Sequence, residues 1–218
     1  MESSGPEILG LGFNAFLLLA SGVFYVLCAL FILKPLRQEK SELIGALFAF
    51  LVYQAVNMFF MGLEFQTMNI IYSNIAALAI FIGSVYMLKF PLSSFSQGIR
   101  KSFFLISMVV VLGLFLWFMQ TEEKQMILMR FVVWYDVVVN GIIVGGFMII
   151  LALRTTERWL RMKAIGGGSG VLSCCIVSDL AMLSGAMIVS AIFSFLAPVL
   201  ILGSLMFARS RQKQISTV

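Results

Sequence analysis

The sequence predicts an all-α membrane protein, a seven-transmembrane-helix bundle with the N-terminus outside and the C-terminus inside. Three observations predict this fold class. Of the 218 residues, 61 % are hydrophobic and only 11 % are charged, which is more apolar than a soluble domain requires. Apolar runs of about 20 residues, the length that crosses a bilayer as a helix, recur along the chain. Basic residues collect in alternate loops between these runs, as topology signals do.

The apolar runs define one domain, residues 1–218, in the cell membrane as a multi-pass protein. A short cytoplasmic tail, residues 209–218, is expected to follow the last helix. The helices are expected over residues 8–33, 43–63, 68–88, 103–119, 126–153, 164–177 and 185–207.

Local signals set the ends of the first four helices. The first is expected to end at Lys34, because Pro35 cannot continue a helix. Glu64 closes the second helix. Pro91 and Gly98 mark a partly non-helical loop after the third, and the fourth leads into the short acidic loop before the fifth.

The last two helices are the least clearly separated. Residues 164–208 contain one ionisable group, Asp179, and are too long for one span. We expect the break between Ser178 and Ser184. The sixth helix opens with GGGSG, which is either a flexible linker or a site of close helix packing; its apolar flanks favour packing.

The basic residues predict the orientation. Only Lys124 and Arg130 lie on the side that would face outward. The positive-inside rule therefore places the other loops in the cytoplasm. Those loops and the tail hold 13 of the 15 basic residues: Lys34, Arg37, Lys40, Lys89, Arg100, Lys101, Arg154, Arg158, Arg161, Lys163, Arg209, Arg211 and Lys213.

The fifth helix carries the most unusual polar residues. Asp136 and Asn140 are four residues apart and share one helix face. A carboxylate near the middle of a membrane costs about 2.5–3.5 kcal/mol on insertion scales, so we expect Asp136 to face the bundle interior. Gly141 and Gly145 form a GxxxG pair, a packing face through which the protein could also form oligomers.

Residue counting along the helices predicts a polar pocket open to the outside above an apolar inner half. The alternative is that its polar groups only hold helices together. An outer charged rim is expected from Glu64, Arg130 and Asp179. The ligand-binding candidates are Tyr53, Gln54, Asn57, Asn74, Asp136 and Asn140.

Several functions are excluded or disfavoured. The chain has no His and three Cys, and we expect no metal site, cofactor or catalytic residue. HExxH and GxSxG motifs are absent. An aspartyl enzyme needs two facing carboxylates, and residue counting puts Asp136 near the midplane but Asp179 in the outer half. We therefore expect no enzyme, and the net charge of +5 follows from topology rather than nucleic-acid binding.

The chain resembles the seven-helix membrane input (sensor) regions of bacterial and archaeal histidine kinases. The resemblance lies in length, in the basic loops KPLRQEK and RTTERWLRMK, and in the polar–aromatic second helix LVYQAVNMFFMGLEF. It implies a receptor or sensor module with signal transduction through a membrane or cytoplasmic partner protein, since no kinase follows Val218. It carries over no functional residue.

Two other functions stay open. One is small-molecule or ion transport using Asp136. The other is a structural or assembly subunit of a membrane complex. We predict the receptor function because a continuous apolar inner half would not conduct.

Overall fold

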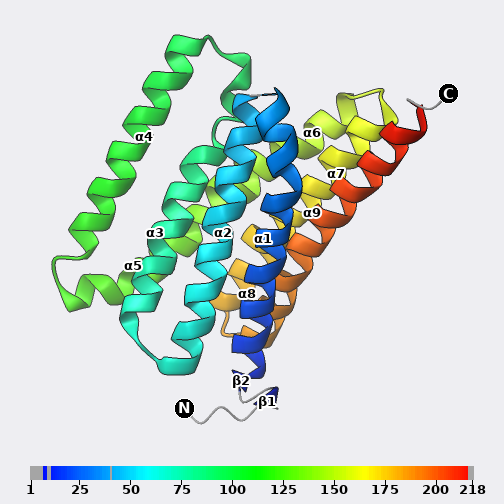
Figure 1. The fold of residues 1–218 in the computed structure, drawn as a ribbon. Coiled ribbons are helices and arrows are strands. Elements are labelled where there is room, and N and C mark those ends of the chain that lie inside the picture. The colour runs from blue at the N-terminus through cyan, green and yellow to red at the C-terminus, as the bar shows by residue number, and fades with distance from the viewer. Residues whose placement is uncertain (1–6, 9–10, 40, 216–218) are drawn as a thin grey trace.

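The computed structural model describes residues 7–8, 11–39 and 41–215, and within them the chain is almost entirely helical (Figure 1). Seven helices in this part are long and apolar enough to cross a membrane, which indicates a multi-pass membrane protein. Four spans are single helices, α1, α2, α3 and α4, and the seventh is α9: Phe13–Glu39, Glu42–Thr67, Ile70–Met87, Gln97–Phe118 and Met187–Ile215.

The fifth and sixth spans each combine α-helix with π-helix. The fifth consists of α5 (Glu122–Asp136), the π-helical segment η2 (Val137–Gly145) and α6 (Gly146–Arg154). The sixth consists of α7 (Arg158–Leu172), the π-helical segment η3 (Ser173–Ser178) and α8 (Asp179–Leu183). Outside the spans, β1 (Glu7–Ile8) pairs antiparallel with β2 (Leu11–Gly12), and η1 (Pro91–Ser94) is a 3₁₀ turn.

Several helix ends differ from the sequence prediction. The fourth and sixth helices begin earlier, at Gln97 and Arg158, and others end later. Helix α1 continues through Pro35 to Glu39, because a proline near the end of a helix removes only one of the last hydrogen bonds. The break before α9 lies at 184–186, where Gly185 adopts a φ of +81°, so Asp179 is inside the sixth span. Helix α9 runs on to Ile215, so most of the expected tail is helical; residues 216–218 lie outside the described residues.

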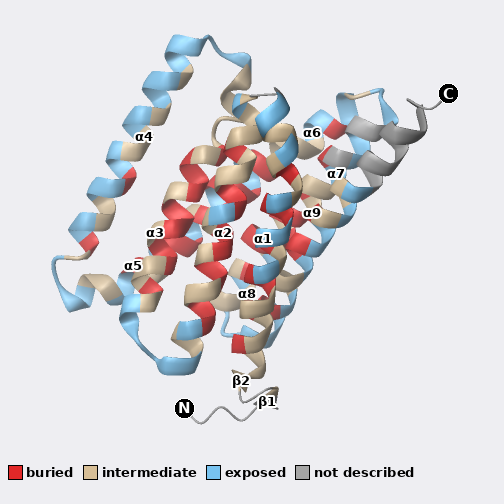
Figure 2. Cartoon of the chain, in the orientation of Figure 1, coloured by how far each residue is buried: buried red, intermediate tan, exposed pale blue. Residues whose placement is uncertain are grey.

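Six of the spans close into a ring. Helix α1 packs between α2 and α9, α2 packs on α3, and the fifth span lies between α3 and the sixth span, which returns to α9. Helix α4 stands at one side against α3 and α5 (Figure 1). Figure 2 shows the buried residues concentrated in the ring, whereas α4 buries only Val111 and Phe118.

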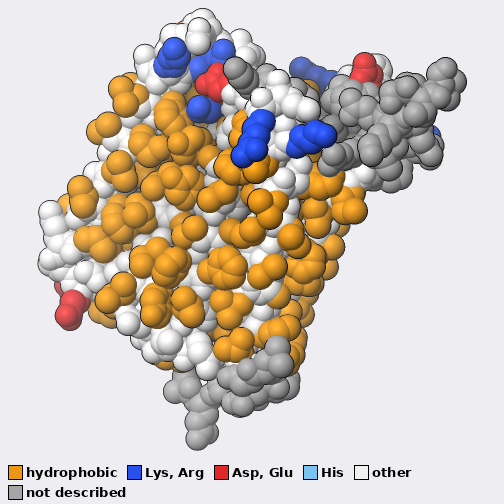
Figure 3. Space-filling model, in the orientation of Figure 1, with side chains coloured by type: hydrophobic (Ala, Val, Ile, Leu, Met, Phe, Trp, Pro, Cys, Tyr) orange, Lys and Arg blue, Asp and Glu red, His pale blue; other side chains and the backbone are white. Residues whose placement is uncertain are grey.

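The two ends of the bundle differ in charge. Lys and Arg side chains gather at one end above a broad hydrophobic band (Figure 3), and the β1–β2 hairpin lies at the other end (Figure 1). At the basic end, the Glu42 carboxylate of α2 forms ion pairs with Lys89 Nζ at 3.4 Å and with an Arg100 guanidinium nitrogen at 3.2 Å. This is the end that the sequence prediction assigns to the cytoplasm.

Glycines bring the last three spans close together. A Cβ on Gly141 would lie 2.5 Å from Ile176 Cγ1, and one on Gly145 would lie 2.9 Å from Leu172 Cδ2. This GxxxG face is therefore covered by the sixth span of the same chain and is not free for the oligomer contact considered from sequence. The GGGSG segment is helical and packs closely as well, with Gly170 against Ile201.

Candidate functional site

Two aspartates lie where the π-helical segments meet the α-helices. Asp136 is the last residue of α5, directly before η2, and Asp179 is the first residue of α8, directly after η3. The two π-helical segments contact each other. Such segments are rare and often occur at functional sites, so their coincidence with the only two aspartates of the chain marks this region.

Asp136 is buried in a hydrogen-bonded cluster with residues of α3 and η2. Asn140 Nδ2 donates to Asp136 Oδ1 and, at 2.7 Å, to Ser84 Oγ. The Ser84 hydroxyl donates to the Ile80 carbonyl at 2.8 Å and lies 3.4 Å from Asp136 Oδ1. Asp136, Asn140 and Ser84 are at most 2 % exposed. Asp136 therefore faces the interior, where the sequence placed it.

Helix α5 packs against η3 and α8, and the carboxyl groups of Asp136 and Asp179 lie close enough to interact electrostatically. The prediction that the two aspartates lie at different depths is therefore wrong. It rested on ending the sixth helix at Val177, whereas the span continues to Leu183 and carries Asp179 about one turn into the bundle. The facing carboxylates that residue counting excluded are present.

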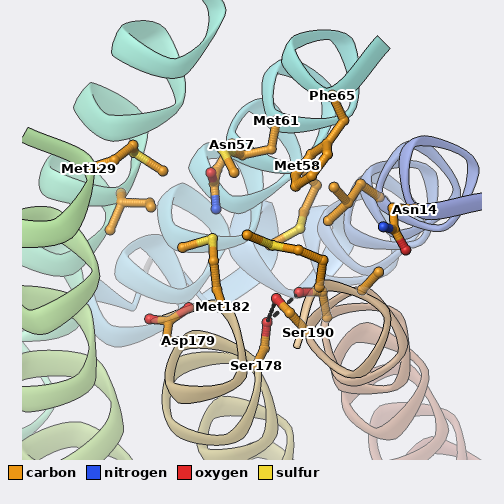
Figure 4. Close-up of a pocket in the computed structure, with 15 residues that line it drawn as sticks. Asn14, Asn57, Met58, Met61, Phe65, Met129, Ser178, Asp179, Met182 and Ser190 are labelled. Atoms are coloured by element: carbon orange, nitrogen blue, oxygen red, sulfur yellow. Dashed lines mark hydrogen bonds between the residues drawn. The ribbon is translucent and has the colours of Figure 1, made fainter. Parts of the chain in front are cut away.

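A small cavity adjoins Asp179 at the end of the bundle that holds the β1–β2 hairpin (Figure 4). Its volume of about 30 Å³ is room for about two water molecules. The polar side chains of Asn14, Asn57, Ser178, Asp179 and Ser190 share its wall with several methionines. The cavity thus joins α1, α2, the sixth span and α9 around one carboxyl group.

The buried polar atoms without a partner in this region are all oxygens. Within the described residues they are Asn14 Oδ1, Asn57 Oδ1, Asn140 Oδ1 and Asp179 Oδ2. Among the described residues, Glu42 is the one carboxylate that forms ion pairs. Neither Asp136 nor Asp179 is therefore paired with a Lys or Arg of that part of the chain. Buried oxygens of this kind require a donor or a cation.

Serines extend the polar region toward α1 and α9. Ser178 Oγ lies 2.7 Å from Ser194 Oγ and 3.1 Å from Ser190 Oγ, and Ser21 Oγ donates to the Ser194 carbonyl at 2.8 Å. Sequence reasoning missed these serines and Ser84, since single serines are common in membrane helices. The one available signal was their recurrence in α9, where Ser190 and Ser194 share a face.

The structure brings together only part of the predicted pocket. Asn57 lines the cavity and donates to Gln54 Oε1 at 3.1 Å, and Asp136 and Asn140 lie in the adjoining cluster. Tyr53 instead stacks on Tyr86, with ring centroids 6.0 Å apart, and Asn74 donates to Gln125 Oε1 at 3.3 Å.

The predicted rim is not formed as a unit. Arg130 is exposed, and Glu64 is half-buried on α2. Asp179, the third residue assigned to the rim, is part of the interior pair with Asp136. The sequence therefore identified these groups as polar positions but misjudged which of them meet.

The inner half of the bundle is apolar. It contains a second cavity of about 210 Å³ whose wall includes Leu47, Phe50, Met87, Met148, Val171 and Ile201. Ser204 is the one polar side chain in this wall. The polar side chains around Asp136 and Asp179 are thus followed, toward the basic end, by a largely apolar lining.

No group of three or more His, Cys, Asp and Glu side chains in the described part of the chain is arranged to hold a metal ion. Cys28, Cys174 and Cys175 are buried and free. No family model, no curated protein and no solved structure matches this chain. Arguments about function therefore rest on the arrangement of these side chains.

Proposed function

We propose that this protein is a sensor in the cell membrane that receives a small polar or ionic signal through the cavity beside Asp179. One observation carries the proposal. The small cavity with Asp179 and the nearby cluster of Asp136, Asn140 and Ser84 are polar, whereas the cavity at the basic end is lined by apolar side chains with Ser204 as its one hydroxyl.

The apolar inner half favours sensing over conduction. An ion that crossed the bundle would have to pass it, and the wall of its cavity offers only the Ser204 hydroxyl in place of the ion's water shell. The size of the cavity limits the signal to a species of one or two water volumes. An intramembrane carboxyl group held by hydrogen bonds is a suitable responder, because a change in its charge alters every contact around it.

The output would leave at the basic end. Lys34, Arg37, Arg154, Arg158 and Arg161 are exposed there. Such a surface suits a partner protein with acidic groups, through which the signal would pass. The fifth and sixth spans run from the carboxyl pair to this end, so a shift at η2 or η3 would move α6 and α7 directly.

Cysteine accessibility in oriented membranes tests the proposal. Silver ion, a thiol-reactive cation of about sodium's size, applied from the outside should modify Asn57→Cys more slowly than Thr67→Cys, which is exposed at the same end. The same reagent applied from the inside should modify Arg37→Cys but not Asn57→Cys. The native protein, with its three buried cysteines, gives the background rate.

The alternatives predict other patterns. Ion or small-molecule transport is favoured by the acidic pair in mid-bundle, and it requires that reagent from the inside also reaches Asn57→Cys when the inner half opens. A structural subunit would leave Asn57→Cys unmodified from both sides. Either result would refute the sensor proposal.

A further inference from the structure

We infer that the cavity lined by Asn14, Asn57 and Asp179 binds a monovalent cation of sodium's size beside Asp136. The inference names the ligand of the site described above. It depends on the proposed function only for the consequence of binding, since the arguments for binding come from the side chains themselves.

Charge is the first argument. Two carboxyl groups in contact cannot both be ionised inside a bundle without a positive charge between them. Within the described residues no Lys or Arg forms an ion pair with either one. The groups that face Asp136 are neutral or acidic: Asn140, Ser84, Cys175, Tyr135 and Asp179. A cation bound beside the pair would supply the positive charge that its ionisation requires.

The unpartnered amide oxygens are the second and independent argument. Asn57 is 5 % exposed and Asn140 is 0 % exposed. The NH₂ group of Asn57 donates to Gln54, and the NH₂ group of Asn140 donates to Asp136 and Ser84. This leaves Asn57 Oδ1 and Asn140 Oδ1 without donors. Asn57 lines the same cavity as Asp179, together with Asn14, whose Oδ1 is also unpartnered. Asn140 turns its Nδ2, not its Oδ1, toward Asp136.

The chemistry of these ligands selects the ion. Carboxylate and amide oxygens bind hard cations, and amide-type oxygens coordinate Na⁺ inside membrane proteins. A divalent ion keeps several water ligands or takes six to eight oxygens, for which the cavity of about 30 Å³ has no room. The cavity of about 30 Å³ admits a sodium ion with a water molecule, but not an organic cation such as choline.

The test compares sodium with choline on the purified full chain in lipid nanodiscs at one ionic strength. A ligand that binds only the folded state raises Tm with the logarithm of its concentration. We expect a rise of about 5 °C or more at a sodium concentration about 100-fold above Kd, with no rise in choline chloride. Equal Tm values in the two salts would overturn the inference and leave water alone as the partner of these oxygens.

Variants locate the effect. Asp179→Asn should abolish the sodium-dependent rise, and Asn57→Leu should weaken it at least tenfold in sodium concentration. Glu122→Gln removes an exposed carboxylate at the same end of the bundle and should keep the full rise. A full rise in Asp179→Asn would place the ion elsewhere and refute the site.

If Asp179→Asn does not fold, a direct measurement of sodium binding to the native protein tests the inference instead. Radioactive ²²Na⁺ should bind the native protein and be displaced by unlabelled Na⁺ but not by choline; absence of displaceable binding would overturn the inference. A different result would refute the sensor proposal and leave the sodium site intact. Sodium binding together with labelling of Asn57→Cys from the inside would keep the site and refute the sensor.

Discussion

Close contact between the sixth span and α9 should make Gly170→Ala destabilising, although alanine is the better helix former. The new Cβ would lie 2.6 Å from Ile201 Cγ1 and 3.0 Å from the backbone oxygen of Ala197. Normal carbon contacts lie at about 3.5–4.0 Å. The overlap of about 1 Å is with the Ile201 side chain, and a rotation of that side chain would leave the tight contact with the Ala197 backbone oxygen in place.

The expected magnitude follows from two opposing terms. Overpacking costs about 1–3 kcal/mol, and replacing glycine within a helix returns up to about 1 kcal/mol. The net loss in the free energy of unfolding is about 1–2 kcal/mol, or a fall in Tm of about 2–8 °C for a chain of this size. The buried Cys28, Cys174 and Cys175 supply the assay, since a thiol-reactive dye reports their exposure on heating.

Gly113→Ala is the matched control. Gly113 lies in α4, and a Cβ there would meet nothing within 4 Å. This variant should therefore be at least as stable as the native protein. If Gly170→Ala were equally stable, the close approach of the two spans would be wrong, and with it the packing that holds η3 and Asp179 in place.

Three further predictions follow from other parts of the chain. Ser84→Ala should lower the free energy of unfolding by about 1–3 kcal/mol, because it leaves the buried Asn140 amide short of an acceptor; thermal unfolding of Ser102→Ala, an exposed serine, is the control, and equal stability of the two variants would argue against the cluster. Met68→Gly should raise stability by about 0.5–1 kcal/mol in the same assay, since Met68 is exposed and ends α2 with a φ of 54°; a loss would mean that the methionine side chain supports the turn. Reporter fusions after Glu122 and after Arg158 should report opposite sides of the membrane, with a fusion after Ser96 matching Arg158; agreement between Glu122 and Arg158 would contradict the topology.

Asp136 shows how far sequence reasoning reached into the site. Its interior position was predictable, because a carboxylate in a long apolar segment is expensive to expose to lipid wherever the helix packs. Its link to Asn140 was also predictable, since residues four apart share a helix face. Its contact with Asp179 was not, because that contact depends on where the sixth span turns.

The sequence by itself determined the number of spans, their approximate bounds and the separation of charge between the two ends, because crossing a bilayer sets composition and length for each helix separately. Only the tertiary structure decided which polar groups meet. The π-helical segments η2 and η3 shift the register of the fifth and sixth spans, and the glycine contacts set their distance. Those two features bring Asp136 to Asp179 and leave Tyr53 and Asn74 apart, since depth along a helix does not fix the direction in which a side chain points.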